Sequence, residues 1–164
     1  ADRSIAVIDT ALRRRFSFRE IIPDPEVLAG VNVEGVSIKD MLVKINERIT
    51  ALYDREHTIG HSCFMPLIKD PSLPTLAGIF KDKIIPLLQE YFYDDYEKIR
   101  LVLGDNQKKA SDEAQFVIAE PFDNKKLFGD TDEDLEEKTS YTINEAAFND
   151  ISAYRNFVRK REDS

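Results

Sequence analysis

The chain has 164 residues, of which 42% are hydrophobic, and a formal net charge of −8. This length is enough for one domain with a buried core, and no apolar run approaches the length that crosses a membrane. The excess of acidic over basic residues argues against a main DNA-binding surface, because duplex binding depends on Lys and Arg that neutralise phosphates. With a single cysteine, Cys63, and no signal-peptide pattern, we expect a cytoplasmic protein.

The first 22 residues predict a helix followed by a strand. Apolar side chains at Ile5, Ile8 and Leu12 share one helical face, so residues 4–14 are expected to be helical. Residues 16–22 then alternate well enough for a strand, which two prolines end because proline removes backbone donors.

Three consecutive arginines, Arg13 to Arg15, stand at the junction between that helix and that strand. A rigid guanidinium at such a corner suits contact with a phosphate, because its fork of donors matches phosphoryl oxygens. The alternative is that these arginines complement the negative end of the helix dipole and stay solvated.

A glycine-rich stretch, residues 30–37, imitates the spacing of a phosphate-binding loop. Val36 stands where the phosphate-reading lysine is required, so we interpret the stretch as turns within a connector over residues 23–36. Because the chain has no phosphate-binding loop of its own and begins with Ala1 rather than Met, we expect a piece of a longer protein, inactive by itself.

Three helices are predicted in the middle of the chain. One covers residues 37–56, and a second apolar stripe over residues 76–91 is broken by Pro86, which should kink the helix or begin a new one. The third covers residues 96–103 and is closed by Gly104. The apolar stripes of these helices are typical of helices that pack in a core.

The last third of the chain is more polar. Residues 105–114 are expected to form a loop, and short strands at 115–119 and 140–143 are expected to pair. The acidic tract 130–137 between them lacks the Gly and Glu of a calcium-binding loop, so we interpret it as solvated.

His61 is a candidate site residue, since it lies between two helical stretches and follows a glycine. It could approach a bound nucleotide, or it could be a structural hydrogen-bonding residue, which is the commoner role for a lone histidine. His57 lies four residues upstream, but the sequence offers no third ligand, so we expect no bound metal.

Four short sequence motifs, taken together and in order, resemble those of AAA+ nucleotide hydrolases of the McrB type. These are the GTP-driven motor subunits of modified-cytosine restriction systems. The four motifs are Asp-Arg-Ser followed by the arginine run, Ile-Gly-His-Ser at residues 59–62, the segment 84–95, and Leu-Gly-Asp at residues 103–105. The resemblance covers residues 1–105 and is weaker beyond them.

The resemblance implies a mainly α fold. Residues 1–22 would be the end of an AAA+ α/β nucleotide-binding domain, contributing one helix and one strand, and residues 37–105 a C-terminal helical lid bundle. Residues 106–164 would be an extension with short strands, a small β element and an acidic loop.

The same resemblance implies roles for particular residues. The candidates for an arginine finger that acts on the neighbouring subunit are Arg15 and Arg14. Arg3 would lie near the same interface or the γ-phosphate and would be oriented by Asp2. The lid's approach to the nucleotide would consist of Gly60, His61 and Ser62.

For the full-length protein the resemblance implies GTP and Mg²⁺ as cofactors and a homo-oligomeric ring. It also implies a nuclease subunit of the McrC type as partner, with modified DNA bound through another domain. Two alternatives remain open: an ATP-dependent AAA+ remodelling motor of the MoxR type, and a non-enzymatic helical interaction module.

Overall fold

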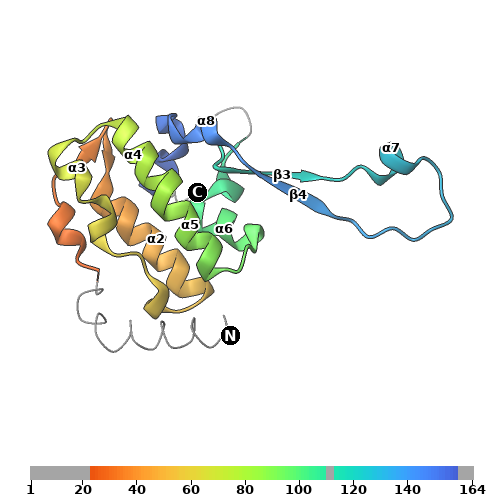
Figure 1. Ribbon diagram of the computed structural model, residues 1–164, viewed down its shortest axis with the longest axis horizontal. Coiled ribbons are helices and arrows are strands. Elements are labelled where there is room, and N and C mark those ends of the chain that lie inside the picture. Colours follow the sequence, from red (N-terminus) through yellow and green to blue (C-terminus); the bar gives the residue numbers. More distant parts are fainter. Residues whose placement is uncertain (1–22, 110–112, 159–164) are drawn as a thin grey trace, which may run out of the picture.

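The computed structural model describes residues 23–109 and 113–158, which form a mostly helical body and a projecting arm (Figure 1). The predicted helix 4–14 and strand 16–22 lie outside the described residues, as do Asp2, Arg3, Arg14 and Arg15. In the described part, no helix is long and apolar enough to cross a membrane.

The connector folds into a 3-10 turn, η1 (Pro25–Leu28), and a two-stranded hairpin, β1 (Asn32–Val33) with β2 (Val36–Ser37). The predicted turn is confirmed at residues 34–35, where Glu34 and Gly35 have φ values of 48° and 85°. The segment also does more than connect, because its apolar side chains enter the core: Leu28, Val33 and Val36.

Helix α2 (Ile38–Leu52) begins where the sequence predicts, because Ser37 Oγ accepts a hydrogen bond from the backbone N–H of Asp40. Its predicted apolar face is buried: Ile38, Met41, Leu42, Ile45 and Ile49. The predicted end at residue 56 was wrong by four residues. Asp54 caps a separate 3-10 turn, η2 (Arg55–His57), and this local bonding stops the helix at Leu52.

The second predicted helix is a continuous run of three parts, α4 (Leu73–Ile79), the π-helical η4 (Phe80–Ile84) and α5 (Ile85–Tyr91), which follows the short η3 (His61–Phe64) and α3 (Pro66–Lys69). Pro86 stands in the first turn of α5. A proline has no N–H to give the preceding turn, and a π segment is one way in which a helix adjusts to such a defect.

Helix α6 (Tyr96–Leu103) has the predicted bounds and is closed by Gly104, as predicted. Asp95 caps its start. The next segment is a 3-10 turn, η5 (Asp105–Gln107), and its polar side chains do not all face solvent. Asp105 and Lys108 are buried and form an ion pair at 2.8 Å. The Asp105 carboxylate also accepts the backbone N–H groups of Phe116 and Val117, so it fixes the start of the next strand.

Strands β3 (Val117–Pro121) and β4 (Thr139–Ile143) pair antiparallel with Val117 opposite Ile143. The predicted pairing is confirmed, although β3 lies two residues later than predicted. Between them lie the short helix α7 (Asn124–Phe128) and the acidic tract, which is exposed as predicted. After β4 the chain returns to the body in α8 (Glu145–Phe148), η6 (Ile151–Ala153) and η7 (Arg155–Phe157).

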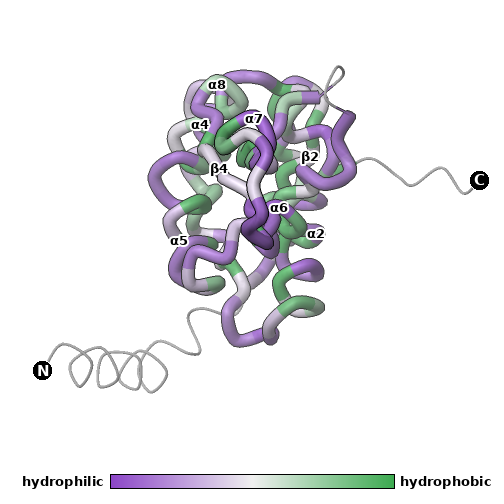
Figure 2. Tube along the Cα trace, turned by 90° about the vertical axis from the view of Figure 1, so that its right-hand side faces the viewer, coloured by the Kyte–Doolittle hydropathy of each residue, from purple (hydrophilic) through white to green (hydrophobic). Residues whose placement is uncertain are grey.

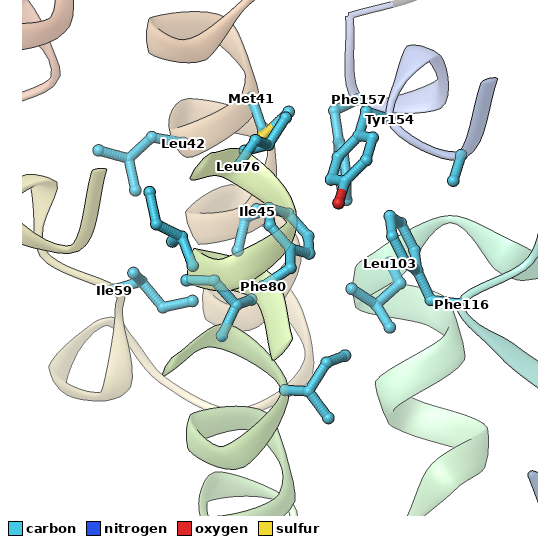
Figure 3. Close-up of a cluster of buried hydrophobic side chains, with 14 of the residues drawn as sticks. Met41, Leu42, Ile45, Ile59, Leu76, Phe80, Leu103, Phe116, Tyr154 and Phe157 are labelled. Carbon is cyan, nitrogen blue, oxygen red and sulfur yellow. The ribbon is translucent and has the colours of Figure 1, made fainter. Parts of the chain in front are cut away.

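The core joins the helices to the C-terminal segment. Rings from both regions meet around Phe80, whose centroid lies 5.3 Å from that of Phe116 and 4.8 Å from that of Tyr154 (Figure 3). The buried Tyr154 hydroxyl donates a hydrogen bond to the carbonyl oxygen of Phe148, and burial raises its pKa. The C-terminal segment therefore packs into the same apolar cluster as the helices, whereas the division of the chain at residues 105 and 106 stays a prediction.

Candidate functional site

The candidate site is the loop of residues 53–62, which links α2 to η3 and carries Gly60, His61 and Ser62. Gly60 is the N-terminal cap of η3, and His61 is its first residue. His61 is half-buried and Ser62 is exposed. The structure thus brings the three predicted lid residues together at one turn.

Asn46, in the middle of α2, fixes this loop. Its side-chain amide donates to the carbonyl oxygen of Ile59 at 2.9 Å, and its side-chain oxygen accepts the backbone N–H of Ile59 at 2.7 Å. The Ile59 side chain is fully buried. Two hydrogen bonds and a buried anchor therefore hold the backbone immediately before Gly60 against the helix.

His61 receives a hydrogen bond from a distant part of the chain. Its Nδ1 atom accepts the backbone N–H of Asp24 at 3.0 Å, across 37 residues of sequence. An accepting Nδ1 carries no proton, so the neutral ring has its proton on Nε2. The structural role predicted as an alternative for His61 is therefore present, and the Nε2–H is the group with which the ring could donate to an oxygen ligand.

Asp54 and His57 form a pair that the sequence analysis missed. The Nδ1 atom of His57 lies 2.7 Å from Asp54 Oδ1 and 3.0 Å from Oδ2. The imidazole is stacked on Tyr53 at 4.2 Å and meets Tyr91 edge-on at 5.3 Å. The signal in the sequence is the spacing of an acid three residues before a histidine, which suits a local pair and is too small a set of ligands for a metal site.

The pKa of Asp54 lies below its ordinary value. Burial pushes this pKa up, but hydrogen bonds from the His57 side chain and backbone and from the Glu56 N–H favour the ionised carboxylate and outweigh it. The pair can therefore hold the loop in shape with a charged carboxylate.

The described residues offer little for metal or thiol chemistry. They contain no group of three or more His, Cys, Asp or Glu side chains that could hold a metal ion. An open depression of about 310 Å³ lies beside η3 and is lined by Cys63, Asp82, Lys83, Pro86, Leu87 and Glu90. Burial raises the pKa of the Cys63 thiol, which disfavours a reactive thiolate.

Comparison with known proteins identifies the helical region. Residues 37–100 match the family described as the alpha-helical lid domain of McrB. Residues 37–100 therefore match an McrB-type lid domain. This lid includes α2, the 53–62 loop, α4, α5 and most of α6.

The chain is also similar to a subunit of a larger enzyme. It is 36% identical over 110 residues to the EcoKMcrB subunit of the type IV methyl-directed restriction enzyme of Escherichia coli (strain K12). The match covers 58% of this chain and 24% of that protein. The chain therefore spans about a quarter of the relative that it matches, and the McrB-type lid is the part that the family comparison defines.

Proposed function

We propose that this chain is the lid-bearing part of a GTP-hydrolysing AAA+ motor that belongs to a modification-dependent DNA restriction endonuclease. The observation that carries the proposal is the McrB-type lid at residues 37–100, together with the similarity to the EcoKMcrB subunit. In this proposal residues 1–22 end the nucleotide-binding domain, residues 23–36 connect it, residues 37–105 are the lid and residues 106–164 extend it.

The proposed catalytic contribution is an arginine finger that acts in trans. Arg15 and Arg14 are the candidates, and Arg3, oriented by Asp2, would lie near the γ-phosphate or the same interface. A guanidinium supplied by a neighbour stabilises the charge of the transition state and contributes roughly 10³ to 10⁵ in the rate of phosphoryl transfer. Hydrolysis would therefore depend on assembly, with a homo-oligomeric ring as the active form.

The proposed role of the 53–62 loop is to bring the lid to the nucleotide. Two observations support it: the loop backbone is held by Asn46, and the His61 ring is fixed by the Asp24 N–H, close to where the arginine-bearing segment joins the described residues. In that orientation the Nε2–H of His61 would donate to a phosphate oxygen, and Gly60 and Ser62 would approach from the same turn.

The full-length protein would bind GTP and Mg²⁺ upstream of this chain. The phosphate-binding loop would supply the metal and phosphate contacts, and this chain would supply the finger and the lid. The proposed partners are a nuclease subunit of the McrC type and modified DNA, which another domain would bind.

The deciding experiment uses the full-length protein. We expect Arg14→Ala or Arg15→Ala to lower GTP turnover by at least 100-fold, because the transition state loses its neighbouring positive charge. Mixing the impaired variant with a protein that has an inactive phosphate-binding loop and an intact finger should restore turnover. Unchanged turnover in both variants would contradict the finger.

The same measurement separates the alternatives. Turnover of ATP in preference to GTP would favour a remodelling motor of the MoxR type. Binding to a protein partner with no turnover of either nucleotide would favour a helical interaction module.

A further inference from the structure

The arm is the most exposed structure in the described part of the chain. We define the arm as β3, β4 and the 17 residues between them, 122–138, and we call these 17 residues the tip. Figure 1 shows the ribbon leaving the body so that the tip stands away from it, and Figure 2 views the molecule from the arm's side. The burial of β3 falls from Val117, which is buried, to Glu120 and Pro121, which are exposed.

The tip carries large apolar side chains in solvent. Nine such side chains are exposed among the described residues, and four of them are on the tip: Phe122, Leu127, Phe128 and Leu135. Leu127 and Phe128 are the most exposed of the four, at 59% and 64%, and both are on α7. An exposed apolar cluster with polar residues around it is typical of an interaction site.

Hydrogen bonds to backbone groups keep the tip in a defined shape. The N–H of Phe122 donates to the carbonyl oxygen of Lys138 and so extends the ladder by one pair. The Asn124 side chain donates to the carbonyl oxygen of Glu136, and Asp123 caps α7. The apolar side chains are thus presented by a shaped element, although a two-stranded ribbon is only marginally stable without a surface to pack on.

The charge of the tip restricts what can cover it. Its 17 residues include seven acidic and three basic side chains. Phosphate backbones would be repelled, which excludes DNA as the occupant. Pairing of two tips from two copies is also disfavoured, since each tip has four more acidic than basic side chains and like charges oppose association. A different protein with a basic rim around an apolar cleft is complementary in both respects.

We propose that the tip is a docking element for the nuclease subunit, which seats Leu127 and Phe128 in an apolar cleft bordered by Lys and Arg. This inference rests on the proposed function, because that function supplies a nuclease partner. The apolar side chains would give most of the affinity, and the acidic tract would guide association and make it sensitive to salt.

The experiment measures binding of the purified nuclease subunit to the full-length protein by calorimetry. We expect the double substitution Leu127→Ser, Phe128→Ser to weaken binding by at least tenfold. The matched control is Ile68→Ser, since Ile68 is 47% exposed on α3 in the body and should leave binding unchanged. GTP turnover without the nuclease subunit should be the same in all three proteins.

A second variant tests the charge. Neutralising Asp132, Glu133 and Asp134 to their amides should weaken binding at low salt and reduce the loss of affinity that added salt causes. If the parent fails to bind the nuclease subunit, or the double variant binds as tightly as the parent, the docking role is overturned while GTP turnover still supports the motor. If the double variant changes self-association in sedimentation instead, the occupant is a second copy and the proposal is wrong. Absence of GTP turnover in the parent would count against the proposed function itself.

Discussion

Gly104 ends α6 in the left-handed region, with φ of 76°, and lies directly against a buried polar cluster. Arg48 of α2 donates to the carbonyl oxygen of Val102 and to the side-chain oxygen of Asn156, each at 3.0 Å. A Cβ atom on Gly104 would come within 1.9 Å of that same Asn156 oxygen. One glycine therefore permits α2, α6 and the C-terminal segment to meet.

We expect Gly104→Ala to lower the free energy of unfolding by about 3 kcal/mol, because it adds left-handed strain and displaces Asn156 from Arg48. Gly78→Ala is the matched control. Apart from its chain neighbours and the backbone of its own helix, nothing lies within 4 Å of the added methyl group there. Because Gly78 is in α4, stability should rise by up to about 1 kcal/mol. Urea unfolding measures both, and equal stability of Gly104→Ala and the parent would contradict the close contact.

At the scale of elements, the 53–62 loop depends on interactions at both of its ends. Asn46 holds Ile59 near one end, while Asp54 holds η2 and His57 near the other. The Asp54 pKa is lowered, so its ionised form stabilises the folded state. The contribution is fully present above the ordinary pKa of 3.8 and is lost as the pH falls through the lowered pKa.

Asp54→Asn tests this contribution, because asparagine still accepts hydrogen bonds from the η2 backbone but carries no charge. We expect the variant to be less stable than the parent at pH 5 by up to about 1 kcal/mol, as for other partly exposed pairs. The two proteins should become equally stable once the pH is below the lowered pKa of Asp54. Thermal unfolding followed by circular dichroism at pH 2 to 7 measures the difference, and a gap that persists unchanged at pH 2 would count against the charge.

At the scale of the whole molecule, the body and the arm differ in how they are held. Rings from η4, from the residue just before β3 and from the C-terminal segment pack together in the core: Phe80, Phe116, Tyr154 and Phe157 (Figure 3). The tip has no comparable burial. Removing residues 106–164 should therefore destabilise the body, whereas removing the tip alone should not.

A protein that ends at residue 105 is expected to lose the cooperative unfolding of the lid, because the Phe80 cluster would be opened and Asp105 would lose its partners Lys108, Phe116 and Val117. Replacing residues 122–138 by Asn-Gly is the control and should leave the melting temperature of the body within a few degrees of the parent's. A stable lid that ends at residue 105 would support the predicted domain boundary instead.

The sequence by itself determined what local forces decide. The start of α2 at Ser37, the end of α6 at Gly104 and the pairing of β3 with β4 could all be predicted, since caps, apolar periodicity and turn residues act over a few positions. The similarity of residues 37–100 to an McrB-type lid was likewise recognisable from short motifs that occur in the expected order. The end of α2 was missed because the cap at Asp54 competes with a continuing helical pattern.

Tertiary structure alone decided which polar residues are buried and which groups they bind. Asp105 lies in a polar stretch that resembles an exposed loop, but its carboxylate is buried against Lys108 and the start of β3. The hydrogen bond from Asp24 to His61 joins positions 37 residues apart. Such contacts depend on how segments distant in the sequence pack together. The periodicity and spacing of residues within one segment cannot predict that packing.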